Sequence, residues 1–197
     1  MGNLAALAQY NLKRLMAYST ISHVGFIFLG LLNGGAQGYS AVLFYTIVYA
    51  LTTAAAFGVI MNFSREGLEF DKIDDFKGLN QRSPWMAFLM LLVMASLAGI
   101  PPLVGFWAKM QVIMAAVALG ETFAWVVLIA AICAVIGAFC YLKIIQVMYF
   151  DAPENDVLPI AGLDVRWVLA CNTLIVVVLG VYWAPLAAVC NAVFMHR

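Results

Sequence analysis

The sequence predicts an all-α integral membrane protein with about five transmembrane helices and the end of another. Its 197 residues are 65% hydrophobic and only 10% charged, whereas soluble domains carry about 45–50% apolar and about 25% charged residues. The apolar residues form long runs, and a hydrocarbon core of about 30 Å needs about 20 helical residues. One run is longer than a single span and contains Pro101 and Pro102. We therefore expect one helix to be broken inside the membrane.

The amino end, residues 1–9, is apolar but lacks the basic start of a signal peptide. We interpret it as the end of a helix whose beginning is absent, which a fragment or a split gene would explain. The first full span is expected over 14–33. A short polar turn at 33–38 then separates it from a second span over 39–62.

The third apolar block, 84–119, would be about 54 Å long as one helix, which is too long for a simple span. Pro101 and Pro102 lack a backbone N–H and clash with the preceding helical turn. Together with Gly99 they mark the expected break. We predict two half-helices, about 84–98 and 103–119, that meet inside the membrane, where irregular backbone is tolerated only if it is buried in protein or lines a wet cavity.

The remaining apolar runs predict a fourth span over 122–150 and a fifth over 165–192, separated by a polar loop at 151–164. The main polar segment, 63–83, precedes the broken helix and carries charges of both signs. Its hydrophobic residues have the spacing of a short amphipathic helix at the membrane surface, where it could contact a partner subunit. These residues are Leu68, Phe70, Ile73, Phe76 and Leu79.

The basic residues predict the orientation. The alternation of spans places 63–83 and 151–164 on one side, and 33–38 with Arg197 on the other. The positive-inside rule makes the first side cytoplasmic, or matrix-facing in a mitochondrion. On or near that side lie Lys13, Arg14, Arg65, Lys72, Lys77, Arg82, Lys143 and Arg166.

Composition and motifs argue against several kinds of chemistry. Net charge is zero and no basic arm is present, so nucleic-acid binding is not expected. The sequence contains no Walker loop, dinucleotide fingerprint or haem-attachment motif. We expect no catalytic residue, cofactor site or metal site in this chain. The cysteines lie in apolar runs without CxxC spacing, and we interpret them as small buried residues: Cys133, Cys140, Cys171 and Cys190.

Lys109 is the leading candidate for function. It lies just after the expected break and about 16 Å along the helix from Gly120, too deep to reach the membrane surface easily. A lysine at the bilayer centre costs at least about 2.5–3.5 kcal/mol on insertion scales, so such residues usually mark ion pathways. Burial would let it exchange between charged and neutral forms. The alternative is pairing with a carboxylate on a partner helix, although no acidic residue of this chain is expected at that depth.

Other polar residues within the spans are weaker candidates. His23 lies about ten residues into its span and could relay protons near neutral pH, or it is a hydrogen-bonded packing residue. Lys143 lies a turn or two from the cytoplasmic end of its span, where it joins a proton path or extends to the surface. Tyr45 and Tyr49 are one helical turn apart and could support a water chain or simply pack.

Two long motifs resemble the antiporter-like membrane subunits of respiratory complex I, and within them most closely the subunit N branch, the counterpart of mitochondrial subunit 2. The second motif is the expected broken helix, residues 97–102 followed by Gly105, Phe106 and Lys109. Residues 141–151 resemble the next helix of that family. The first motif consists of Gly2, Asn3, Leu4, Ala6, Leu7, Gln9, Asn11, Lys13, Arg14, Leu15, Ala17, Tyr18, Ser19, Thr20, Ile21, His23 and Gly25.

The resemblance implies a proton-pumping domain of two inverted repeats, of which residues 1–197 would be the carboxyl-terminal part. It implies that Lys109 is the broken-helix lysine of the family and that His23 and Lys143 occupy relay positions. A key glutamate and two lysines of the first repeat have no counterpart here. NADH oxidation and quinone reduction would drive pumping, with quinone, FMN and iron–sulfur clusters in other subunits and no redox chemistry in this chain.

The predicted function is that of a proton-translocating membrane subunit of NADH:quinone oxidoreductase, a translocase. Two alternatives remain: a subunit of a cation/proton antiporter or membrane-bound hydrogenase, and a structural scaffold without its own proton path. The expected partners are other membrane subunits of complex I, the lipid bilayer and, for a split subunit, a separate chain with the preceding helices. We expect a multi-pass protein of the bacterial plasma (inner) membrane in preference to the mitochondrial inner membrane.

Overall fold

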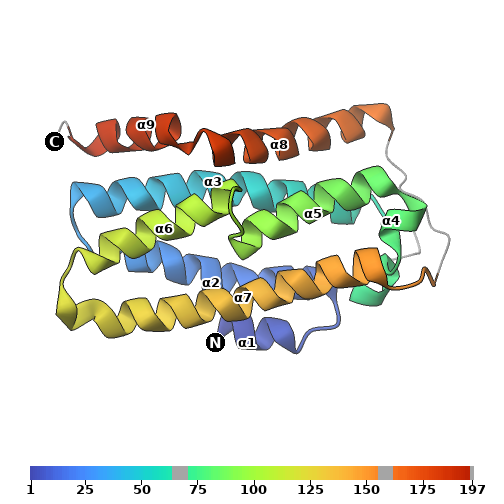
Figure 1. Cartoon of the computed structure of the whole chain (residues 1–197), viewed down its shortest axis with the longest axis horizontal. Coiled ribbons are helices and arrows are strands. Elements are labelled where there is room, and N and C mark those ends of the chain that lie inside the picture. The colour runs from blue at the N-terminus through green and yellow to red at the C-terminus, as the bar shows by residue number, and fades with distance from the viewer. Residues whose placement is uncertain (64–70, 155–161, 196–197) are drawn as a thin grey trace.

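The computed structural model describes residues 1–63, 71–154 and 162–195. Within these residues every regular element is helical, and the long helices lie side by side along one direction (Figure 1). Four helices are long and apolar enough to cross a membrane, namely Leu12–Leu31 (α2), Ala36–Met61 (α3), Glu121–Phe150 and Leu163–Val181 (α8). The predicted all-α membrane fold is confirmed.

The first helix, α1 (Gly2–Leu7), lies between α2 and α7 (Ala124–Phe150). A Cβ at Gly2 would lie 2.8 Å from the Tyr18 carbonyl oxygen of α2, so only glycine permits this approach. On the other side the Asn3 amide donates a hydrogen bond to the Cys133 carbonyl of α7. The short helix is therefore held by its backbone and by one buried amide. The next helix, α2, begins where the Asn11 side chain accepts a hydrogen bond from the Arg14 amide.

The predicted break is present between α5 (Pro84–Ala98) and α6 (Val104–Val117). Gly99 ends α5 in the left-handed conformation, with φ at 87°, which favours glycine. The Pro101–Pro102 peptide that follows is cis. Beyond it the two half-helices approach closely, because a Cβ at Gly105 would collide with the Ser96 carbonyl oxygen. Two half-helices rather than one long helix therefore form this span, as the prolines predict.

A second break was not predicted. The fifth span, expected as one helix over 165–192, is divided into α8 and α9 (Trp183–Met195), with Tyr182 between them. Pro185 explains it, because its ring clashes with the carbonyl group four residues earlier and it cannot donate a hydrogen bond there. The two pieces lie end to end along α3 (Figure 1). The prediction of a single continuous helix over 165–192 was therefore wrong.

The polar segment 63–83 does not form the expected amphipathic surface helix where it is described. Residues 71–83 instead contain two short helices, η1 (Ile73–Phe76) and α4 (Leu79–Arg82). Ile73, Phe76 and Leu79 are buried, because the chain at 71–73 hydrogen-bonds to the start of α2 and turns these side chains into the bundle. Leu68 and Phe70 lie outside the described residues.

The two polar loops meet at the same end of the bundle. Lys77 Nζ lies 2.6 Å from Glu154 Oε1, and the Gly78 amide donates to the Val147 carbonyl. These hydrogen bonds with Glu154 and then with Asp74 raise the pKa of Lys77. The turn between α2 and α3 and the end of α9 lie at the opposite end (Figure 1). The helices thus alternate as the sequence predicts, and the side that faces the cytoplasm stays a prediction.

Cysteine labelling tests the orientation. In a chain whose exposed Cys171 is replaced by serine, Gly162→Cys should react with a membrane-impermeant maleimide from the cytoplasmic side only. Gln37→Cys should react from the opposite side only. Both positions are exposed, and an added side chain at Gly162 meets open space. Labelling of both from one side would contradict the assignment.

The cysteines agree only in part with their expected burial. All four are free, and Cys140 and Cys190 are buried in the bundle. Cys171 is exposed on α8, because the buried residues of this helix lie on another face: Leu169, Thr173, Val176 and Gly180. The interpretation as small buried residues was therefore wrong for Cys171 and holds only in part for Cys133, which is half-buried.

Candidate proton-transfer site

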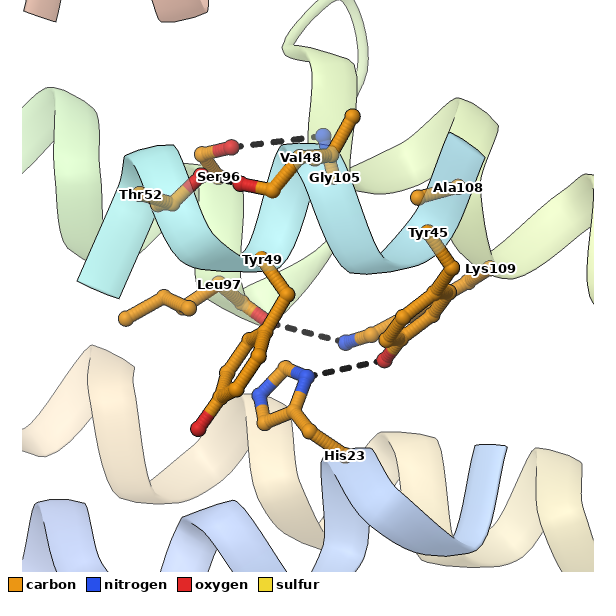
Figure 2. A pocket seen from close by; sticks show the side chains of 10 residues that line it. All are labelled: His23, Tyr45, Val48, Tyr49, Thr52, Ser96, Leu97, Gly105, Ala108 and Lys109. Atoms are coloured by element: carbon orange, nitrogen blue, oxygen red, sulfur yellow. Dashed lines mark hydrogen bonds between the residues drawn. The ribbon is translucent and has the colours of Figure 1, made fainter. Parts of the chain in front are cut away.

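Polar side chains from three long helices and the broken helix meet in the interior of the bundle. His23 of α2 lies at their centre and is 6% exposed. Tyr45 and Tyr49 reach it from α3, and Tyr141 reaches it from α7. Lys109 points from α6 toward the same space (Figure 2). Both tyrosines reach His23 because they are one helical turn apart, on the face of α3 that meets α2.

Both ring nitrogens of His23 have hydrogen-bond partners. Nδ1 lies 2.8 Å from the Tyr45 hydroxyl, and Nε2 lies 3.0 Å from the Tyr141 hydroxyl. The Tyr49 ring stacks on the imidazole at a centroid distance of 4.4 Å. His23 is thus the hydrogen-bonded, packed histidine of the simpler interpretation. The same contacts also suit a relay, because each nitrogen faces a group that can give or take a proton.

The direction of these hydrogen bonds follows from the partners. Ser19 donates its hydroxyl proton to the Met16 carbonyl and must therefore accept from Tyr141, whose hydroxyl lies 2.9 Å away. Tyr141, having donated its only proton, must accept from Nε2–H of His23. The neutral imidazole then accepts at Nδ1 from Tyr45. One directed chain results, running from Tyr45 through His23 and Tyr141 to Ser19.

Lys109 binds the backbone of the break. Its Nζ donates to the Leu97 carbonyl at 2.8 Å and to the Ala98 carbonyl at 2.9 Å. These carbonyls belong to the last turn of α5, where the intrahelical partners run out and the helix dipole favours a cation. The Phe26 ring centroid lies 5.9 Å from the ammonium group, a cation–π distance. Within residues 1–63, 71–154 and 162–195 Lys109 forms no ion pair, so the carboxylate alternative finds no support there.

A small cavity of about 10 Å³ separates Lys109 from His23. That is room for about one water molecule. The Lys109 amine, the Tyr45 hydroxyl and the His23 ring face one another across it (Figure 2). Its polar lining is His23, Tyr45, Tyr49, Thr52, Ser96 and Lys109. A proton could pass from Lys109 through one water to the Tyr45 hydroxyl and from there to His23, without any large movement of these side chains.

Lys143 is the one predicted site residue that the structure does not bring to this cluster. It lies on α7, half-buried, two residues after Tyr141. Two residues correspond to about 200° around a helix, so Lys143 lies on the side of α7 away from the one that carries Tyr141. Its relay role stays a prediction.

Two residues of the site were missed from the sequence. Tyr141 links His23 to Ser19, and Ser96, which is fully buried, accepts a hydrogen bond from the Gly105 amide through its Oγ. A hydroxyl in the middle of an apolar run was the available signal for both. In the sequence Tyr141 is only the first residue of the motif 141–151, and a lone serine beside a break has many ordinary roles.

Removal of the Tyr141 hydroxyl should interrupt the directed chain. In Tyr141→Phe, His23 Nε2–H loses its acceptor while the aromatic ring stays, so we expect proton translocation to fall by about tenfold. Tyr149→Phe is a matched control on the same helix, half-buried and outside the chain. The measurement is the initial rate of proton uptake by inverted membrane vesicles at equal amounts of assembled complex. Equal rates in both variants would contradict a role of the Tyr141 hydroxyl.

The fold and the site define a class of protein. It is an all-α membrane protein in which a broken helix holds a lysine beside a buried, hydrogen-bonded histidine. Over residues 1–146 the chain matches the family described as NADH:quinone oxidoreductase/Mrp antiporter, TM. The chain belongs to this family.

Relatives and solved structures agree with that assignment. NADH-quinone oxidoreductase subunit N of Thiobacillus denitrificans (strain ATCC 25259 / T1) is 53% identical over 191 residues, which cover 96% of this chain and 39% of that protein. A chain of respiratory complex I from Thermus thermophilus with bound aureothin is 32% identical with a TM-score of 0.83, covering 95% of this chain and 42% of that one. A chain of the membrane-bound sulfane sulfur reductase, an archaeal respiratory membrane complex, is 29% identical with a TM-score of 0.84, covering 98% and 39%.

The chain therefore spans about two fifths of the length of the curated relatives it matches, 39% and 40% for the two at 53% and 51% identity.

Proposed function

We propose that this chain is the carboxyl-terminal part of a proton-translocating membrane subunit of a bacterial NADH:quinone oxidoreductase. The observation that carries the proposal is Lys109, a lysine inside an apolar bundle that binds backbone carbonyls and faces His23 across a small cavity. A lysine with a carboxylate partner would suit a fixed structural role, whereas one bound only to carbonyls can be neutral or charged. The 53% identity to a subunit N favours this function over an antiporter or hydrogenase subunit.

Lys109 can exchange a proton without losing its hydrogen bonds. A charged lysine has three N–H donors. Two of them bind the Leu97 and Ala98 carbonyls, which leaves one for the cavity. A neutral amine retains two N–H groups and gains a lone pair, so it keeps both carbonyl bonds and turns the lone pair toward the cavity. The break therefore holds Lys109 in the same place in both protonation states.

His23 would pass the proton along the directed chain. When Nδ1 takes the Tyr45 hydroxyl proton, which a proton from the cavity replaces, the imidazole can give its Nε2 proton to Tyr141. Tyr141 then gives its own hydroxyl proton to Ser19, and Ser19 would release its hydroxyl proton to water beyond the chain. The hydroxyl groups of the chain then reverse their hydrogen bonds to restore the starting arrangement. Histidine suits this step because one ring nitrogen can accept a proton while the other gives one up.

A second polar space extends from α6 toward the end of the bundle that carries the α2–α3 turn. This cleft of about 190 Å³ lies between α3, α6 and α9 and could hold several water molecules. Ser40 Oγ and Gln111 Nε2 are buried there without a hydrogen-bond partner among the described residues. Gln111 follows Lys109 by two residues on α6. Two residues correspond to about 200° around the helix, so the cleft lies on the side of α6 away from Lys109 and is separate from the cavity between Lys109 and His23.

The proposal places the redox chemistry elsewhere. Quinone, FMN and iron–sulfur clusters would be bound by other subunits, which are also the proposed partners of this chain in the bacterial plasma membrane. The helices that relatives carry beyond the matched part would come from the same subunit or from a separate chain. This chain would contribute the lysine and the histidine chain.

The test is proton translocation by the assembled complex with Lys109 replaced. Protons moved per NADH oxidised are measured in inverted vesicles, with the amount of assembled complex determined independently. A scaffold without its own proton path predicts no change in this ratio.

A further inference from the structure

The break between α5 and α6 and the break between α8 and α9 are packed against each other. Gly180, the next-to-last residue of α8, is buried against the segment that joins α5 to α6. An added Cβ at Gly180 would lie 2.7 Å from the Val104 nitrogen and 2.8 Å from the Leu103 Cα, distances that side chains essentially never adopt. The backbones of the two breaks are therefore in direct contact, and glycine is required at position 180.

Trp107 binds both pieces of the second broken helix. Its indole Nε1–H donates to the Gly180 carbonyl at 3.0 Å, and this carbonyl lies in the last turn of α8, where helical carbonyls lack intrahelical partners. Its ring stacks on Trp183, the first residue of α9, with a centroid distance of 4.6 Å and an angle of 19°. The first turns of α6 are thus held from outside by α8 and by α9.

Lys109 lies two residues after Trp107, about 200° around the helix. Trp107 and Lys109 therefore bind opposite sides of the same turn of α6. The hydrogen bonds of Lys109 to the Leu97 and Ala98 carbonyls, 2.8 and 2.9 Å long, would be lost if α6 moved away from α5 by about 1 Å. Few other hydrogen bonds cross the break, the nearest being from the Gly105 amide to Ser96.

We propose that Trp107 and Gly180 form a clamp that holds the α5–α6 break in place and so keeps Lys109 on its two carbonyl groups. They are positioning residues, since neither touches the proton path. The clamp has two expected consequences, a looser break when it is removed and an altered proton yield. Only the altered proton yield rests on the proposed function. The looser break is independent of what Lys109 does.

The first measurement follows the break directly. Trp107→Phe keeps an aromatic ring for Trp183 but removes the N–H donor. In the purified, assembled complex we expect the amides of residues 97–106 to exchange with deuterium about three- to tenfold faster than in the parent. Trp125→Phe is the control, because Trp125 is 73% exposed on α7 and distant in sequence from both breaks. Unchanged exchange in Trp107→Phe would overturn the clamp.

The second measurement is the number of protons moved per NADH oxidised, over a range of pH. Trp107→Phe should lower this ratio about twofold or more and shift its pH profile, whereas Trp125→Phe should leave both unchanged. In a Lys109→Arg background Trp107→Phe should have no further effect, because the two residues act through one site. Faster exchange with an unchanged ratio and profile would overturn the positioning role.

Gly180→Ala provides the second variant. Its added methyl group must push the breaks apart, so both effects should exceed those of Trp107→Phe. An assembled Gly180→Ala complex with parental exchange and proton yield would also overturn the proposal. If this variant does not assemble, the measurements on Trp107→Phe test the clamp by themselves.

Normal pumping by Lys109→Arg would contradict the proposed function alone. Deuterium exchange in Trp107→Phe would still show whether the clamp exists.

Discussion

Replacement of Lys109 by arginine should abolish most proton translocation while the complex still assembles. Arginine has enough N–H donors to bind the Leu97 and Ala98 carbonyls, so it can satisfy the last turn of α5 as lysine does. It cannot release its proton at any physiological pH. We expect protons moved per NADH to fall by about tenfold or more, and NADH–quinone turnover to fall with them if the two are coupled.

Lys109→Ala separates the structural and the functional roles of this lysine. It removes the proton carrier and also leaves two buried carbonyl groups without their donor, at about 1–3 kcal/mol each. We therefore expect Ala to lose translocation and also some assembled complex, whereas Arg loses translocation alone. Lys77→Arg, in the polar loop outside the spans, is the control for a conservative lysine exchange. Parental proton yield in a well-assembled Lys109→Arg complex would exclude proton exchange at this position.

His23→Gln should impair translocation nearly as strongly. A glutamine side chain offers one acceptor and two donors, so it can accept from Tyr45 and donate to Tyr141 as the neutral imidazole does. It has no group that takes up a proton near neutral pH. We expect normal assembly and a proton-uptake rate about tenfold lower. A decrease of this size is smaller than the rate enhancement of about 100-fold or more that one positioned acid–base group usually gives.

His23→Ala gives the comparison for packing. It removes a buried ring, takes the acceptor from the Tyr45 hydroxyl and takes the donor from the Tyr141 hydroxyl, so it should also destabilise the bundle by about 2–5 kcal/mol. Thermal denaturation of the purified complex measures this loss. If His23→Gln translocates protons normally and His23→Ala fails only in assembly, His23 is a packing residue and the relay is wrong.

The sequence alone was sufficient to predict the broken helix and a lysine just after the break. The length of an apolar run and the chemistry of Gly99, Pro101 and Pro102 are local properties, and they act in the same way in any fold. The same rule applied to Pro185 would have found the second break. It was missed because the run 165–192 is close to the length of an ordinary span and gave no reason to divide it.

The partners of the site residues could not be predicted in this way. The spans are apolar around most of their circumference, so no periodic pattern marks the side that faces another helix. Nothing in the sequence pairs His23 with Tyr141, which lies 118 residues away, or pairs Trp107 with Gly180.

The sequence by itself determined that this is a membrane protein with a lysine beside a helix break. Only the tertiary structure decided that backbone carbonyls hold that lysine, that His23 lies at the centre of one directed hydrogen-bond chain, and that the second break packs on the first. The physical reason is that helix ends and spans are specified by neighbouring residues, whereas contacts between helices depend on how whole surfaces fit together.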